Sequence, residues 1–345
     1  MREIIQKIVQ EAIWAPSGDN SQPWTFRLEG SDLFITANPE KDHPILNVDG
    51  RGTLIATGAL LENIAIAAQE FCCRASMVPT ENAAVIRVSF AEDGEPGHPL
   101  YRAIRDRHTN RGPYVHAPLQ ADEIAALSEI REKHCRTVVV TDAALVSAIS
   151  EAASIMEETA LRTRKLHSLF FKSLIWSSVA ASKGEPGLYI KATELPPPIQ
   201  LLFKLIRHWP IMRALNTVGF SKLAAKSNAA VYATSAACVA TILDRVEPVD
   251  FIYAGRCMQR AWLELTNRDL SAQPLAGLLY LAEYLSRTSD PDIPADLRER
   301  VFASRHTLLN IFGAGTNESI AMILRVGKAK RPATARARRR PPRFV

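Results

Sequence analysis

The chain has 345 residues, 47% of them apolar and 23% charged, with a formal net charge of +6. This composition excludes wholesale disorder, and the length allows one large domain or two ordinary ones. No apolar run is long enough to cross a bilayer, and the polar first residues do not fit a signal peptide, so we expect a cytoplasmic protein without membrane contact.

The first predicted elements are a helix and a turn. Apolar residues recur at helical spacing between residues 4 and 13, and a strand-like run follows at residues 24–28. Pro16, Gly18 and Pro23 separate these two elements. The turn is crowded with donors and acceptors, contributed by Ser17, Asp19, Asn20, Ser21 and Gln22. Such a turn can hold a flat ring with polar edges, although the same residues also collect at ordinary capped turns.

Two alanine-rich segments, residues 58–70 and 254–266, each predict a buried helix at the centre of a lobe, opening at a glycine. Strands are predicted around them, with a break at residues 271–275; the strands cover residues 32–37, 84–90, 136–141, 229–234 and 319–326. Helices that alternate with short strands indicate an α+β or α/β class with a modest sheet.

We interpret residues 1–95 as a first lobe and residues 96–345 as a larger second lobe. The second lobe includes a mostly helical insertion at about residues 155–226, which is the most aromatic part of the chain. These aromatic side chains either pack a small core of their own or form a lid over a site.

Residues 107–111 read Arg-His-Thr-Asn-Arg and form the second informative motif. Two guanidinium groups on either side of a hydroxyl suit a phosphate, because arginine gives charge-assisted and bidentate contacts. The plain alternative is a solvated, charged loop.

Other chemistries leave no trace in the sequence. The five cysteines form no Cys-x-x-Cys pair and the eight histidines show no metal spacing, so we expect neither a metal centre nor disulfides. The Gly-x-Gly-x-x-Gly, Walker and Gly-x-Ser-x-Gly patterns are absent, which argues against a separate Rossmann domain and against a hydrolase. No side chain stands out as a general base.

The basic residues are concentrated near the C-terminal end. Residues 325–345 hold nine Lys and Arg and no acid, which leaves 33 basic and 36 acidic residues in the rest of the chain. This tail is interpreted as a solvated segment, a nucleic-acid arm or an anion site. Since no aromatic platform or base-reading motif accompanies it, we expect no nucleic-acid partner.

The turn at residues 16–24 resembles the Pro-Ser-x-x-Asn-x-Gln-Pro-Trp signature of the FMN-dependent nitroreductase superfamily. Residues 107–111 resemble the family motif Arg-Arg/His-Ser-x-Arg/Lys, which grips the FMN phosphate, with Thr109 in place of the serine. In dimeric members one chain carries both motifs, phosphate motif first, and each flavin lies at the dimer interface.

Here the two motifs are split, because the first lobe has only the turn and the second lobe has only the phosphate motif. The resemblance therefore implies two related, nitroreductase-like lobes fused in one α+β chain as a pseudo-dimer with a single flavin site. This arrangement is similar to the Acg-type branch of the family. Such a chain is expected to be a monomer or a weak homodimer.

The resemblance also implies the cofactor-binding residues. One of the tail arginines Arg336, Arg338, Arg339 and Arg340 is expected at the FMN phosphate, and Arg339 is favoured. The backbone of residues 275 and 276 is expected at flavin N5 and O4. The full expected set is Pro16, Ser17, Gly18, Asn20, Gln22, Arg107, His108, Thr109, Arg111, Leu275, Ala276, Arg338 and Arg339. No catalytic side chain is expected, because the flavin itself carries the hydride.

The activity implied is an FMN-dependent oxidoreductase that passes hydride from NAD(P)H to nitroaromatic, quinone or related small acceptors. The helical insertion leaves an alternative open. A lid that never opens would give a flavin-binding protein with little or no turnover.

Overall fold

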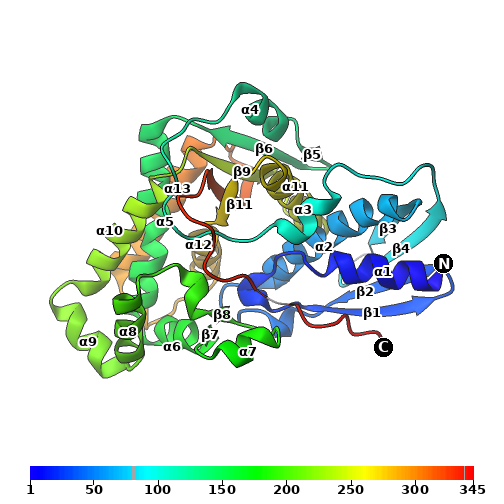
Figure 1. Cartoon of the computed structure of the whole chain (residues 1–345). Coiled ribbons are helices and arrows are strands. Elements are labelled where there is room, and N and C mark those ends of the chain that lie inside the picture. The colour runs from blue at the N-terminus through cyan, green and yellow to red at the C-terminus, as the bar shows by residue number, and fades with distance from the viewer. Residues whose placement is uncertain (80–82, 338) are drawn as a thin grey trace.

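The computed structural model describes residues 1–79, 83–337 and 339–345. It contains two antiparallel sheets, each packed against its own long helix, and the two long helices pack against each other (Figure 1). This mixed helix and sheet content agrees with the class expected from the sequence.

The first sheet has the strand order β1-β2-β4-β3, and all its neighbours are antiparallel. Its long helix, α2, connects the second strand to the third. The elements of this half are α1 (Arg2–Ala12), β1 (Trp24–Glu29), β2 (Asp32–Ala37), α2 (Arg51–Glu70), β3 (Cys73–Pro79) and β4 (Val85–Glu92), with short 3-10 turns at Gly18–Asn20, Pro39–Lys41 and Val48–Gly50.

The second sheet has the order β10-β11-β9-β6-β5, again antiparallel throughout. Apart from the two-residue edge strand β5, this sheet repeats the plan of the first one. Its four strands follow one another in the chain as β6, β9, β10 and β11 but lie side by side as β6-β9-β11-β10, just as β1 to β4 lie as β1-β2-β4-β3. In both sheets the long helix connects the second strand of the chain to the third. The elements of this second half are α3 (Tyr101–Asp106), α4 (Ala121–Ser128), β5 (Arg131–Glu132), β6 (Cys135–Val140), β9 (Ala237–Leu243), α11 (Pro248–Asn267), β10 (Ser271–Pro274) and β11 (Ser319–Gly327).

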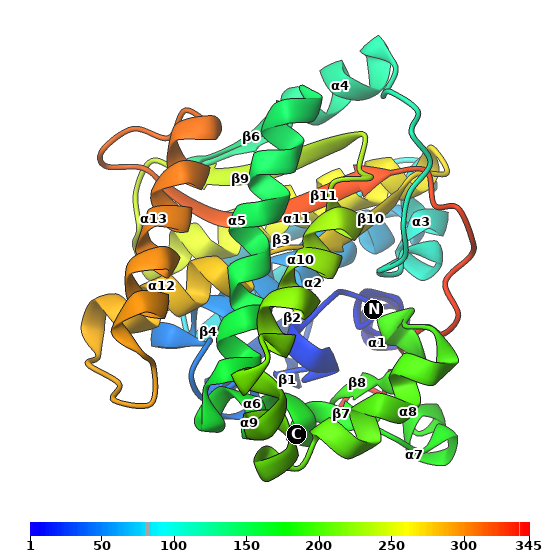
Figure 2. The same ribbon diagram turned by 90° about the vertical axis from the view of Figure 1, so that its left-hand side faces the viewer.

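The connections distinguish the two sheets. Between β1 and β2 lie two residues, whereas a long helical segment separates β6 from β9 (Figure 2). Side chains of this segment pack a small core of their own. This segment contains α5 (Ala143–Arg162), α6 (Arg164–Ser173), β7 (Leu174–Ile175), α7 (Ser178–Ser182), β8 (Leu188–Tyr189), a 3-10 turn (Ile190–Thr193), α8 (Pro197–Ile206), α9 (Trp209–Thr217) and α10 (Phe220–Tyr232). A second helical connection, α12 (Gly277–Arg287) and α13 (Ala295–Ile311), joins β10 to β11.

The two long helices cross at a pair of glycines. A Cβ on Gly58 would lie 2.0 Å from the carbonyl oxygen of Ile252, and a Cβ on Gly255 would lie 2.1 Å from that of Ile55. The contact is therefore reciprocal, and any larger side chain would collide with backbone. The expectation that each helix opens at its glycine is wrong, because α2 and α11 begin seven residues before these positions and the glycines serve close packing.

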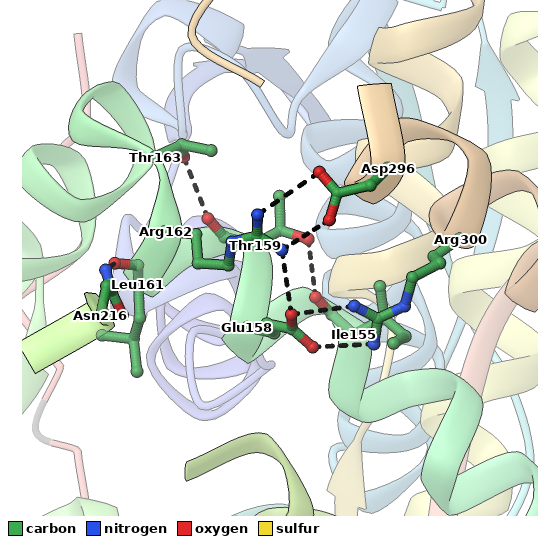
Figure 3. A network of polar contacts seen from close by, with 9 residues as sticks. All are labelled: Ile155, Glu158, Thr159, Leu161, Arg162, Thr163, Asn216, Asp296 and Arg300. Atoms are coloured by element: carbon green, nitrogen blue, oxygen red, sulfur yellow. Dashed lines mark hydrogen bonds and ion pairs between the residues drawn. The ribbon is translucent and has the colours of Figure 1, made fainter. Parts of the chain in front are cut away.

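A buried carboxylate holds the helical segment to α13 (Figure 3). The Glu158 side chain is 2% exposed and receives two hydrogen bonds of 2.8 Å from Arg300 and one of 3.3 Å from Arg162. Burial raises the pKa of Glu158, but these bonds outweigh it and the pKa lies below its ordinary value. Arg162 continues the network to Asp296 at 2.7 Å.

Two local expectations differ from the structure. Residues 229–234 were expected as a strand, but most of them belong to helix α10, whose buried face is set by Ala225, Ala229 and Tyr232. Tertiary packing thus overrides the β-propensity of Val231 and its neighbours. Conversely, the predicted break at residues 271–275 contains strand β10, an edge strand that tolerates Pro274.

No helix within the described residues is long and apolar enough to cross a membrane. All five cysteines are free thiols.

Candidate functional site

The loop after α1 has unusual backbone geometry. Asp19, Asn20 and Gln22 have φ values of 44°, 56° and 48°, in the left-handed region that side chains rarely adopt. The Gln22 amide donates to Ser17 Oγ at 3.0 Å and helps to hold this conformation. A Cβ on Gly18 would lie 2.7 Å from Asp42 Oδ1, so a larger residue there would have to displace the Asp42 side chain. Strained non-glycine residues of this kind cluster at ligand sites.

Arg107 joins this loop to the second half of the chain. It lies at the end of α3, is 6% exposed, and stacks 4.4 Å over the ring of Trp262 on α11. Its Nη2 donates to the carbonyl of Trp14 at 3.0 Å, while its Nε has no hydrogen-bond partner among the described residues. Burial and then the charge of Arg339 lower the pKa of Arg107 to about 9.

The C-terminal tail brings a second guanidinium to the same place. Arg339 Nη2 lies 3.4 Å from the Trp14 oxygen that Arg107 also contacts, and 3.2 Å from the Ala15 oxygen. Its Nη1 donates to Asn20 Oδ1, and burial lowers the pKa of Arg339 to about 10. Two like charges thus share a neutral carbonyl acceptor, which favours an anion beside them.

The tail itself is anchored on the first sheet. The Phe26 amide donates to the carbonyl of Arg343 at 3.0 Å, and the Val345 amide donates to the carbonyl of Phe26 at 2.8 Å. Phe344 pairs with Phe26, their ring centroids 5.8 Å apart. The tail therefore runs from the second sheet to the edge of β1, as Figure 1 shows.

These segments line one cavity of about 110 Å³. Eight of the residues expected from the sequence lie in its wall: Pro16, Ser17, Asn20, Arg107, His108, Thr109, Arg111 and Arg339. The wall also holds Arg105 and Arg336, against only Asp19 and Glu185 as acids. Its positive balance and the orphan Nε of Arg107 suit a phosphate or another compact anion.

The remaining wall residues differ in their surroundings. Arg111 donates to the carbonyl of Ala192 at 3.0 Å, and burial lowers its pKa. Burial also lowers the pKa of His108, whose Nδ1 lies 2.8 Å from the carbonyl oxygen of Asp106. Thr109 forms a bridge with Ala272, so this segment runs along β10.

Four expected residues do not line the cavity. Gly18 is not in the wall of this cavity, and a Cβ built on it would point toward the Asp42 side chain. Gln22 faces a different cavity of about 370 Å³, between β1 and the tail, where its Oε1 accepts the Arg340 amide at 2.8 Å. Leu275 and Ala276 are buried in the two main cores, and the Leu275 amide already donates to the carbonyl of Ile323 at 2.8 Å. Arg338 lies outside the described residues.

The helical segment covers the cavity. Its residues 175–192 supply part of the wall, and two hydrogen bonds to its backbone fix it to the loop. The Gln22 side chain donates through Nε2 to the Gly184 oxygen at 3.1 Å, and the Gly187 backbone amide donates to the Asp19 oxygen at 2.5 Å. The sequence offered a lid over a site as one of two roles for this insertion, and the structure shows both a small core and a part of the cavity wall. The individual hydrogen bonds at Gly184 and Gly187 could not be foreseen, because they use backbone atoms that every residue type has.

Sequence reasoning also missed Arg325. This arginine of β11 is fully buried, stacks 4.1 Å from the ring of Tyr114, and donates at 2.7 Å to both the Gly112 oxygen and Gln273 Oε1. It thereby fixes the loop that follows Arg111. The available signal was one charged residue inside an otherwise apolar strand.

Comparisons with known proteins give distant relatives, and no family model matches the chain. The chain is 26% identical to the uncharacterized protein MT1398 of Mycobacterium tuberculosis over 290 residues, covering 80% of this chain and 39% of that protein. It is 29% identical over 199 residues to a protein of the same organism named "Putative NAD(P)H nitroreductase acg", covering 53% of this chain and 56% of that one. The match therefore spans less than two thirds of either relative.

Similar solved structures include nitroreductase A from Vibrio parahaemolyticus, with a TM-score of 0.37, 9% identity, and coverage of 70% of this chain and 72% of that one. A nitroreductase with bound FMN from Desulfitobacterium hafniense has a TM-score of 0.34 and 11% identity, with coverage of 70% and 94%.

Proposed function

We propose that this chain is an FMN-dependent oxidoreductase of the nitroreductase type, which takes hydride from NAD(P)H and passes it to nitroaromatic, quinone or related small acceptors. The observation that carries the proposal is the single cavity where the strained loop meets Arg107, Arg111 and Arg339. The similarity to the nitroreductase-named relative supports the same class. A cytoplasmic location and the absence of a nucleic-acid partner stay predictions.

The phosphate of FMN fits the cluster of guanidinium groups. It would accept from the orphan Nε of Arg107, neutralise the charges that Arg107 and Arg339 bring together, and reach the hydroxyl of Thr109 and the guanidinium of Arg111. In the nitroreductase family such a loop meets the flavin ring, and here Ser17 and Asn20 are the side chains in position to do so.

When bound, FMN supplies the hydride chemistry, so the protein needs no catalytic acid or base of its own. The residues of the chain bind the phosphate, orient the ring and limit the access of water. The backbone of Leu275 and Ala276 could contact flavin N5 and O4 only if this part of the backbone moved, because the Leu275 amide already donates to the carbonyl of Ile323 in the second sheet.

We also propose that the chain is a fused pseudo-dimer of two nitroreductase-like lobes, residues 1–95 and 96–345. The repeated strand order and the reciprocal crossing at Gly58 and Gly255 support this proposal. Since each lobe supplies one wall of the cavity, the chain should bind one FMN and need no second subunit. A monomer or a weak homodimer is the corresponding oligomeric state.

A specific observation favours the alternative of a flavin-holding protein with little turnover. The cavity of about 110 Å³ is smaller than the roughly 300 Å³ at which ligand pockets begin, because residues 175–192 cover it. The phosphate fits as it stands, whereas the ring requires this covering segment to move. A cover that opens once for loading and then stays closed would sequester the flavin.

Binding measurements test the site. The Arg107→Ala and Arg339→Ala variants should each weaken FMN binding by about 10- to 150-fold, the equivalent of one charge-assisted contact. Arg331→Ala, an exposed tail arginine outside the cavity wall, is the matched control and should bind FMN as the parent does. Titration should saturate at one FMN per chain. Equal affinity in all three variants, or two FMN per chain, would contradict the assignment.

Stopped-flow mixing of the FMN-loaded protein with NADPH and with NADH separates the two functions. Rapid bleaching of the flavin absorbance supports the oxidoreductase. A flavin that stays oxidised at saturating nicotinamide, in a protein that binds FMN tightly, supports the flavin-holding alternative.

A further inference from the structure

The helical segment between β6 and β9 exposes an unusual share of large apolar side chains. Of the thirteen such exposed side chains among the described residues, seven fall within residues 179–223. These are Val179, Ile199, Leu201, Leu205, Ile211, Val218 and Leu223. Single exposed apolar residues are ordinary, but seven in one stretch of 45 residues set this segment apart from the rest of the described chain.

The segment does not need these side chains for its own core, because other residues of the same helices fill it. Helices α8 to α10 turn other residues inward, among them Ile206 and Met212, which are fully buried in the small core. Leu201 and Leu205 lie one helical turn apart and share a face of α8, with 62% and 54% of their surfaces exposed. The outward face is therefore apolar in addition to the face that folds the segment.

The same helices are strongly basic. Between Glu194 and Asp244 the sequence contains no acidic residue. The basic residues of α8 to α10 are all exposed, and none forms an ion pair within the part of the chain that the structure describes; they are Lys204, Arg207, Arg213, Lys222 and Lys226. Residues 164–232 contain ten basic and two acidic residues, whereas the rest of the chain outside the tail contains 23 basic and 34 acidic residues.

We propose that helices α8 to α10 form a docking surface for an anionic phospholipid bilayer, contrary to the sequence-based expectation of no membrane contact, which rested on the lack of a spanning segment and of a signal peptide. Exposed leucines flanked by lysine and arginine on short helices bind in the interface of a membrane, where the apolar side chains enter the acyl boundary and the cations meet lipid phosphates. A bilayer accepts protruding side chains without a matching shape, whereas a protein partner needs a complementary surface. Figure 1 shows α8 and α9 side by side at the lower left corner of the molecule, and Figure 2 shows both along its lower edge.

Co-sedimentation with vesicles tests this surface on the full chain. Vesicles of phosphatidylcholine with 30% phosphatidylserine should bind the protein, and pure phosphatidylcholine vesicles should bind it at least ten-fold more weakly; this composition is about that of an anionic leaflet. Binding should also fall when NaCl is raised from about 0.1 to 1 M, because the screening length shrinks from about 10 to 3 Å.

Paired variants locate the contact. Lys204→Gln with Arg207→Gln should weaken binding by about 25-fold, at about five-fold per charge removed. Leu201→Ser with Leu205→Ser should weaken it by about ten-fold or more. The matched controls lie elsewhere on the surface and should bind as the parent does: Arg131→Gln with Lys133→Gln, and Leu145→Ser with Val246→Ser.

Three results would overturn the proposal. The first is equal binding to both kinds of vesicle. The second is loss of vesicle binding in a triple tail variant, Lys328→Gln with Lys330→Gln and Arg331→Gln, while both helix variants bind fully. This result would place the membrane contact on the basic tail. The third is absence of vesicle binding together with a dimer that Leu201→Ser, Leu205→Ser dissociates in sedimentation velocity, which would make the surface an interface between copies.

Discussion

The two halves of the chain share a sheet plan but differ in what they add to it. The first half joins β1 to β2 by two residues, while the second half places a long helical segment at the corresponding connection and two further helices between β10 and β11. The shared part carries the crossing helices. The added part carries the cavity cover, the excess of exposed cations and most of the exposed apolar side chains. The sheets and crossing helices, which the halves share, and the helical connections, which only the second half has, thus occupy separate stretches of the sequence.

The halves also contribute different walls to the cavity. The first half gives the strained loop, and the second gives Arg107 and Arg111 together with the tail. Neither half holds both parts, so the comparison extends from architecture to the site.

The largest expected effect on stability concerns the crossing of the two long helices, which both halves share. Gly58→Ala and Gly255→Ala should each lower the free energy of unfolding by about 4 kcal/mol, because the new methyl group would meet a backbone carbonyl that cannot turn away. Urea unfolding followed by tryptophan fluorescence measures the effect. If the halves are built alike here, the two losses should agree within about 1 kcal/mol.

Gly315→Ala is the control for this pair. Its new Cβ would find Glu318 Oε2 at 3.6 Å, an ordinary contact, and its stability should change by less than about 0.5 kcal/mol. A large loss in only one of the two crossing glycines would break the equivalence of the halves.

The second test addresses a region that the first half lacks. Glu158→Gln should cost about 3 kcal/mol, because it leaves the guanidinium groups of Arg162 and Arg300 without their buried carboxylate. Asp296→Asn removes an exposed partner of the same network and should cost less than about 1 kcal/mol. Equal losses in the two variants would show that the segment is not held by this carboxylate.

The pH dependence has a defined sign. Since the folded pKa of Glu158 lies below the ordinary value of 4.5, its stabilisation is present above pH 4.5 and is lost as the pH falls through the folded pKa. The difference in unfolding free energy between the parent and Glu158→Gln should therefore shrink in that acidic range, and a difference that stays constant down to pH 2 would be inconsistent with it.

The smallest expected effect concerns the tail on the first sheet. Phe344→Ala should cost about 1 kcal/mol, as one aromatic pair with Phe26 is removed at the sheet edge. FMN affinity should fall with it, since the tail positions Arg339, while Arg331→Ala should leave both stability and affinity unchanged. An unaltered affinity in Phe344→Ala would show that the tail keeps its path without this anchor.

Much of the fold could be predicted because apolar periodicity marks buried faces. The strands at residues 32–37 and 319–326 and the two long helices were expected close to where they lie. The helix starts were misplaced because a glycine is a common boundary signal, and only tertiary contact shows that Gly58 and Gly255 are needed for packing. The strand expected at residues 229–234 failed because burial against α5 decides that segment.

The site was predictable to the extent that side-chain chemistry defines it. Arginines, a threonine and a polar turn are visible in sequence, and eight of these residues meet in one cavity. Leu275 was expected through its backbone alone, and the sheet pairing that engages its amide could not be foreseen. A lid from the helical insertion was one of the two expected roles, but its backbone contacts at Gly184 and Gly187 could not be foreseen, since carbonyl and amide groups are common to every residue type.

The path of the tail has a consequence for how the cavity is made. Arg339 is synthesised after every other residue that lines the wall, and it reaches back to a loop more than 300 residues earlier in the chain. A nascent chain can fold its first sheet while the rest is still being translated. The cavity then lacks one wall until residues 339–345 have been translated and the tail has reached β1, so the cavity is completed late in synthesis.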